Sequence, residues 1–166
     1  MWPRAVEVAC WLRRRAENVT VLLLTVMFAS FIIQIFWRYV LNNPIGWSEE
    51  VVITMWMWTV LWGAAFVIRE NEEIRFDILY SAVSERTRHV FAIVTGTILV
   101  LVYAISLPAA YSYVTFMKVE RSAYLHVPIN YMYSIYLIFA VASICRYVWL
   151  VCQAILAIRN ATDSGT

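Results

Sequence analysis

The sequence predicts an all-α membrane protein with four transmembrane helices, an amphipathic interfacial helix before them, and both ends in the cytoplasm. The first observation is composition. Of the 166 residues, 63% are hydrophobic and 14% are charged, whereas soluble domains average about 45–50% apolar and about 25% charged residues. The second is the presence of four apolar stretches long enough to cross a bilayer. The third is the uneven distribution of arginine among the segments that connect these stretches.

The four stretches are defined by the thickness of the membrane. A crossing helix needs about 20 mostly apolar residues, because the hydrocarbon core is about 30 Å thick and each residue rises about 1.5 Å. The stretches that qualify are about 19–40, 51–68, 90–117 and 128–158. The third is long, and we expect it to tilt, to kink at Pro108 or to project from the membrane. The transmembrane domain therefore covers 18–159, and 160–166 is expected to be a disordered tail.

Orientation follows from the basic residues near the span ends, which are enriched on the cytoplasmic side. Most of them fall on the side that holds both ends of the chain and the loop between the second and third spans. That side has Arg4, Arg13, Arg14, Arg15, Arg69, Arg75, Arg86, Arg88 and Arg159, against Arg38, Lys118 and Arg121 on the other. Both ends are therefore expected to be cytoplasmic.

Residues 1–17 have an amphipathic pattern. Apolar side chains recur at helical spacing and charged ones fall elsewhere on the helical wheel, which indicates a helix lying in the cytoplasmic interface. The apolar positions are Trp2, Ala5, Ala9, Leu12 and Ala16, and the charged ones include Arg4, Glu7 and Arg14. A cleaved signal peptide is the alternative, weakened by the long charged lead and by the absence of a small-x-small site followed by a soluble domain.

No catalytic or cofactor-binding group is predicted. His89 and His126 are expected at opposite faces of the membrane, too far apart to share a metal or a haem. The three cysteines lack metal-ligand spacing and are expected to pack or to contact lipid. A net charge of +2 gives no footprint for nucleic acid.

A transport pathway within this chain is also not predicted, because no carboxylate lies centrally in any span. Gln34 is a candidate for a hydrogen bond between helices. Arg146 lies inside the fourth span, where an arginine usually has a function. It could instead extend to the cytoplasmic headgroups. A contact with another subunit or with membrane lipid would suit either interpretation.

The segment 38–69 is the most informative part of the sequence. Ser48 is expected to cap the second span, with Glu49 and Glu50 near the positive end of the helix dipole. These carboxylates also suggest an ion pair with Arg38 or with a partner. Further on, Gly63 begins a small-residue patch, Gly63-Ala64-Ala65, that a neighbouring helix could approach closely.

In this segment the chain resembles the small membrane subunit of tripartite ATP-independent periplasmic (TRAP) transporters. The resemblance rests on Arg38-Tyr39, a short Asn/Pro loop, Trp47-Ser48-Glu49-Glu50, a Trp-rich helix, Gly63-Ala64-Ala65 and Arg69, and it extends to the four-span layout and to Val127-Pro128-Ile129. One position departs from the family. Members commonly have a histidine soon after the arginine that follows the second span, and Glu73 stands there in this chain, so a role of that histidine is not transferred.

The resemblance implies a bacterial inner-membrane protein that binds a large membrane transport subunit, which holds the substrate and sodium sites and moves as an elevator. A periplasmic substrate-binding protein would deliver the organic acid. On this reading the chain is a non-catalytic scaffold, with Arg38, Trp47, Ser48, Glu49 and Glu50 securing the outer contact. Arg146 and residues 1–17 would anchor the inner face. Two alternatives remain open: a four-span membrane enzyme for a lipid-like or thiol substrate, and a self-assembling small transporter.

Overall fold

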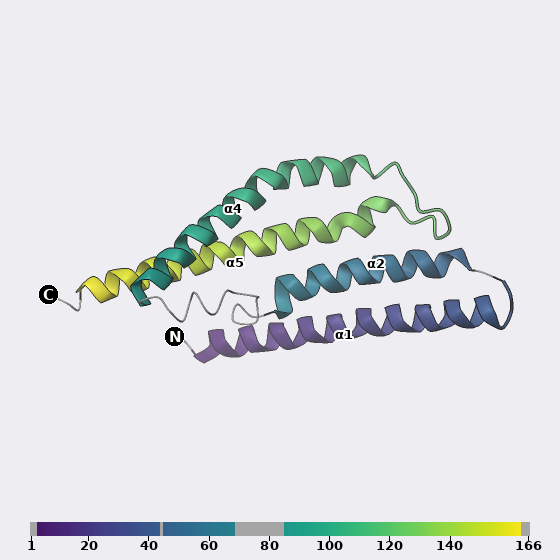
Figure 1. Ribbon diagram of the computed structural model, residues 1–166, viewed down its shortest axis with the longest axis horizontal. Coiled ribbons are helices and arrows are strands. Elements are labelled where there is room, and N and C mark those ends of the chain that lie inside the picture. The colour runs from purple at the N-terminus through teal and green to yellow at the C-terminus, as the bar shows by residue number, and fades with distance from the viewer. Residues whose placement is uncertain (1–2, 44, 69–84, 164–166) are drawn as a thin grey trace. The chain divides into compact units, whose positions relative to one another are not determined.

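The computed structural model describes residues 3–43, 45–68 and 85–163, and within them it contains four long helices and one π-helical segment. These elements are α1 (Pro3–Tyr39), α2 (Gly46–Trp62), η1 (Gly63–Val67), α4 (Glu85–Phe116) and α5 (Ile129–Asp163) (Figure 1). Four stretches are long and apolar enough to cross a membrane: Cys10–Tyr39, Gly46–Val67, Thr87–Phe116 and Ile129–Arg159. The predicted all-α fold with four membrane-spanning helices is confirmed.

The helix bounds differ from the predicted spans at several ends. α1 runs without a break from Pro3 to Tyr39, so the predicted interfacial segment and the first span form a single helix. Its location in the interface and the cytoplasmic location of both ends stay predictions. α5 continues to Asp163, into the segment predicted as a tail. α4 continues through Pro108.

The chain divides into two compact units. The first comprises 1–68 and 111–139, and the second comprises 69–110 and 140–166. Each therefore contains part of α4 and part of α5.

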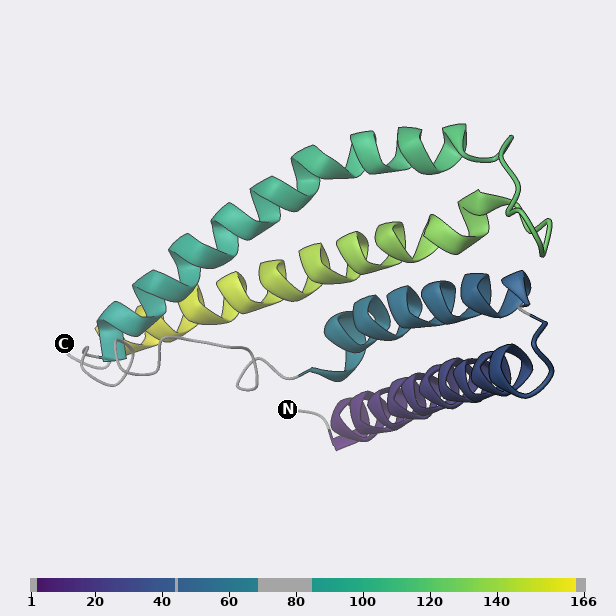
Figure 2. The same cartoon turned by 45° about the vertical axis from the view of Figure 1, so that its right-hand side comes forward.

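In the first unit, α1 and α2 lie side by side and antiparallel (Figures 1 and 2). α1 ends because Asn42 adopts a left-handed conformation with φ of 50°, which asparagine tolerates better than most residues. The Asn43 amide then donates a hydrogen bond to the Trp37 carbonyl at 3.2 Å. Extended backbone at Ile45 leads directly into α2.

α2 passes into η1 at a glycine. The Ile68 amide donates to the Gly63 carbonyl at 3.0 Å, the five-residue spacing that defines a π-helix. Glycine has low helix propensity, so the regular α-helical pattern is weakest where η1 begins. The Trp62 and Phe66 rings lie across this junction with centroids 4.6 Å apart.

The second unit pairs the first part of α4 with the last part of α5. A Cβ at Gly96 would lie 2.6 Å from Val151 Cγ2, so the glycine permits a close approach of the two helices. The Tyr103 and Tyr147 rings stack with centroids 6.5 Å apart. Arg146 lies half-buried in this part of α5.

Few side chains are buried in either unit. The buried apolar residues among those described are Ala16, Val114, Ile135, Ala140 and Ala154. Many large apolar side chains on the helices are instead exposed, as expected for helices whose solvent is lipid.

Candidate functional site

Polar contacts between distant segments gather at the start of α2 and at the segment that joins α4 to α5. That segment folds back on itself over Glu120–Ile129, which we call the connecting hairpin. The Ser122 amide donates to the Val127 carbonyl at 3.0 Å, and the Ile129 amide donates to the Glu120 carbonyl at 3.0 Å. His126, with φ of 53°, lies in the chain reversal that the bond between Ser122 and Val127 closes.

Glu50 holds the tip of the connecting hairpin against α2. Its carboxylate oxygens accept hydrogen bonds from the Tyr124 amide at 2.9 Å and from the Leu125 amide at 3.1 Å. Bonds from backbone amides to a carboxylate are charge-assisted and stronger than neutral ones. The contact joins residues more than 70 positions apart in the sequence, so it fixes the tertiary position of the hairpin.

Gly46 completes this contact by leaving room for an aromatic ring. A Cβ at this position would collide with the ring of Tyr124. The Tyr124 ring can therefore lie against the first residue of α2 only because that residue is a glycine. Glu50 and Gly46 lie one helical turn apart, so they face the hairpin together.

Two tryptophans of α2 donate hydrogen bonds to neighbouring helices. Trp58 Nε1 donates to the Met132 carbonyl of α5 at 3.0 Å, and Trp62 Nε1 donates to the Ala16 carbonyl of α1 at 3.2 Å. The two rings are four residues apart and so lie on neighbouring turns of one side of the helix. Through these bonds and Glu50, α2 is the element that links α1, α5 and the connecting hairpin.

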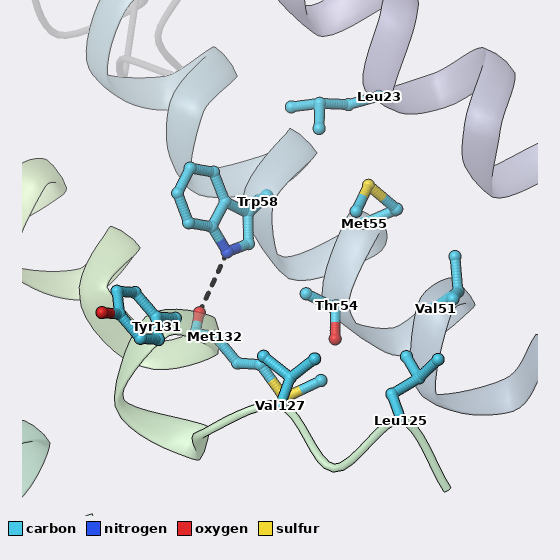
Figure 3. A pocket seen from close by; sticks show the side chains of 9 residues that line it. All are labelled: Leu23, Val51, Thr54, Met55, Trp58, Leu125, Val127, Tyr131 and Met132. Atoms are coloured by element: carbon cyan, nitrogen blue, oxygen red, sulfur yellow. Dashed lines mark hydrogen bonds between the residues drawn. The ribbon is translucent and has the colours of Figure 1, made fainter. Parts of the chain in front are cut away.

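An apolar cavity of about 400 Å³ lies beside Trp58. Figure 3 shows its walls, which come from α1, α2, the connecting hairpin and the first turn of α5. The lining residues are Leu23, Val51, Thr54, Met55, Trp58, Leu125, Val127, Tyr131 and Met132.

A second cavity, of about 260 Å³, has a more polar wall that includes Glu50 and Ser122. The Ser122 hydroxyl and Asn130 Oδ1 are buried and have no hydrogen-bond partner among the described residues. Over the same residues, no cluster of three His, Cys, Asp or Glu side chains is arranged to hold a metal ion.

The prediction that Ser48 caps α2 is wrong. The capping position is Ile45, which makes no side-chain cap, because the helix begins three residues earlier than the serine pattern suggested. The Ser48 hydroxyl instead donates to the Ile45 carbonyl at 3.0 Å, and the side chain is fully buried.

The suggested ion pair between Arg38 and the two glutamates is not formed within the described chain. The Arg38 guanidinium lies 5.9 Å from the centroid of the Tyr39 ring, and Glu50 binds the hairpin amides. Glu49 and Trp47 are exposed. A pair with a partner chain stays a prediction.

The remaining predicted site residues are not gathered at this site. A Cβ at Gly63 would meet nothing within 4 Å, so no close helix approach in the described chain depends on this glycine. Arg146 belongs to the second unit. Arg69 and Glu73 lie outside the described residues.

Sequence reasoning missed Gly46, Trp58, Trp62 and Tyr124. The two tryptophans did carry a signal. An indole N–H inside a span needs an acceptor, because lipid offers none, and their spacing of four residues places both on one face. Nothing in the local sequence pointed from Glu50 to the hairpin amides.

Comparison with known proteins agrees with the resemblance seen in the sequence. The family model described as tripartite ATP-independent periplasmic transporters, DctQ component, matches residues 13–159. The chain is 35% identical over 57 residues to the C4-dicarboxylate TRAP transporter small permease protein DctQ of Vibrio cholerae, covering 34% of this chain and 25% of that protein. It is 31% identical over 72 residues to the sialic acid TRAP transporter small permease protein SiaQ of the same organism, covering 43% of this chain and 42% of that protein. The matched segments thus span less than half the length of either relative.

Proposed function

This chain belongs to the DctQ component family of TRAP transporters, and we propose that it is the non-catalytic scaffold subunit of a sodium-coupled importer of organic acids. As a family member with four apolar helices, it is a multi-pass inner-membrane protein. In the proposed role it binds and stabilises the large membrane transport subunit. The two relatives are named for C4-dicarboxylates and for sialic acid, which supports an organic acid as the substrate class.

The proposal is supported by the small amount of apolar surface that the chain buries within itself. Its helices expose large apolar side chains along their length, for example Trp56 at 59% and Ile105 at 77%. No carboxylate lies centrally in any span, so a coupling ion would find no acidic ligand there. Helices with outward apolar surfaces and no internal ion site suit a subunit that works by packing against another membrane protein.

The polar contact with the large subunit is assigned to the start of α2. Glu49 is exposed beside Glu50, and its carboxylate makes no ion pair within the described chain. Glu50, by contrast, is engaged by the connecting hairpin. We therefore assign Glu49 to a cationic side chain of the large subunit, and we assign Glu50 to positioning the hairpin.

The hairpin end of the first unit is proposed to face the periplasm. Its exposed residues would then be available to the periplasmic substrate-binding protein. Val119 and Tyr124 are 88% and 64% exposed. Basic and acidic groups (Lys118, Glu120 and Arg121) flank them, which suits a transient and partly polar contact.

Co-purification with the large subunit tests the assignment. Changing both Glu49 and Glu50 to Ala is expected to weaken recovery of the large subunit on a tagged small subunit. The single changes separate the two roles, because Glu49→Gln should weaken recovery without altering the hairpin. If the double variant assembles as wild type does, the two carboxylates do not bind the large subunit and act only within this chain.

Uptake by proteoliposomes tests the scaffold role. Vesicles with the large subunit, the binding protein and a sodium gradient should take up substrate only when this chain is present. Full uptake without it would contradict the proposal.

A further inference from the structure

The lining of the apolar cavity beside Trp58 indicates what kind of molecule can occupy it. Its hydrogen-bonding groups are already used within the chain. Trp58 Nε1 donates to the Met132 carbonyl at 3.0 Å, and the Thr54 hydroxyl donates to the Glu50 carbonyl at 2.7 Å. The Tyr131 hydroxyl points away from the other lining side chains (Figure 3). No polar group of the lining is left to hold water.

The position of the cavity determines what can reach it. Its walls come from three membrane-spanning stretches, since Leu23, Trp58 and Met132 each lie in a different one. Its end wall is the connecting hairpin, through Leu125 and Val127. The cavity therefore extends from the hairpin at the end of the spans toward their middle, where Leu23 and Met55 lie. Exposed lining residues mark its opening, with Tyr131 at 65% and Leu125 at 39%.

An empty cavity of this size is unfavourable because its lining atoms lose their dispersion contacts. Hydrocarbon is the solvent of these helices and is present whether or not a partner binds. A linear alkyl chain needs no hydrogen bond from the lining residues. The lining also has no free hydrogen-bonding group that would select a particular protein side chain. We propose that the cavity binds one acyl chain of a phospholipid from the leaflet on the hairpin side.

This role of the cavity differs from subunit binding. A bound acyl chain would contact α1, α2 and α5 together and fill the space between Leu23 and Met55. It would thus act as a structural lipid of the small subunit itself. The inference does not depend on the proposed transport function, because the site lies within this chain.

Two leucines of α1 provide matched variants. Leu23 lines the cavity, and Leu22 is 62% exposed and does not line it. Leu23→Trp should fill the cavity and exclude the acyl chain. Leu22→Trp adds the same bulk on a side of the helix that is outside the cavity.

The first measurement is retention of lipid. The full chain is extracted from phosphatidylethanolamine and phosphatidylglycerol nanodiscs into mild detergent, and bound phospholipid is counted by native mass spectrometry. Wild type and Leu22→Trp should each retain one phospholipid, and Leu23→Trp should retain none. Equal retention in all three proteins, or no retention in wild type, would overturn the proposal.

The second measurement needs no variant to fold. Wild-type chain in the same nanodiscs receives a small share of phosphatidylcholine with a diazirine in its acyl chain. After illumination, labels are mapped by peptide mass spectrometry. Labels on Met55 and Met132 are expected. Labelling confined to exposed side chains such as Leu22 would overturn the proposal. Loss of the Met55 and Met132 labels when the large subunit is bound would also overturn the proposal, since a side chain of the large subunit would then occupy the cavity.

Discussion

Replacing Trp58 by Phe tests whether α2 holds the first unit together. The variant keeps an aromatic ring in the wall between α2 and α5 but removes the donor to the Met132 carbonyl, a bond of 3.0 Å. Hydrogen bonds between membrane helices contribute on average about 0.6 kcal/mol and at most about 1.7 kcal/mol. The smaller ring also enlarges the neighbouring cavity, which adds a further cost of the same sign. We therefore expect a loss of about 1–2 kcal/mol in the free energy of unfolding, roughly a 5- to 30-fold change in the equilibrium constant.

The assay is equilibrium unfolding of the full chain in mixed micelles, with increasing amounts of denaturing detergent. The matched control is Trp56→Phe, which changes the same residue type on the same helix. Trp56 is 59% exposed, so its replacement should change the free energy of unfolding by less than about 0.5 kcal/mol. If the two variants lose the same stability, the indole bond contributes nothing and α2 is not the linking element described above.

Three further predictions concern close contacts. Gly46→Ala should cost about 1 kcal/mol of stability, the low end of the range for overpacking, because the added methyl group collides with the Tyr124 ring and that ring is exposed and can turn aside; Tyr124→Ala in the same chain should restore part of the loss, and no recovery would refute the contact. Glu50→Gln should speed hydrogen exchange at the two amides of the hairpin tip, measured by mass spectrometry, and unchanged exchange would show that the charge is not needed. Gly96→Ala should destabilise the second unit unless Val151→Ala is added, since the added Cβ would lie 2.6 Å from Val151 Cγ2; additive losses in the double variant would count against the close approach.

The number and positions of the helices could be predicted from the sequence because membrane spans obey a simple length requirement. Where helices end was harder. Residues 3–17 of the interfacial pattern and the first span form one helix. The charged residues Arg13 and Glu17 form an i,i+4 pair within it at 3.0 Å and do not interrupt it. η1 could not be predicted, because its backbone pattern depends on hydrogen-bond spacing and not on hydrophobicity.

The candidate site could be predicted only in part. The sequence pointed to the start of α2, and Glu50 and Ser48 do lie there. Their roles differed from the expected ones because the partners are backbone groups, which leave no mark in the sequence. Glu50 accepts from amides of the hairpin, and Ser48 donates to the carbonyl of Ile45. A local pattern predicts local caps and pairs. A contact across more than 70 residues depends on the fold.

We propose that this chain functions by assembling with a larger membrane transport subunit. The native mass of the tagged small subunit, purified after co-expression with the large permease of its own transporter, tests this assembly. We expect a stable complex that contains both chains and stays intact in mild detergent. Recovery of this chain alone, or as an assembly of identical copies without the large permease, would refute the assembly and favour a self-assembling small transporter.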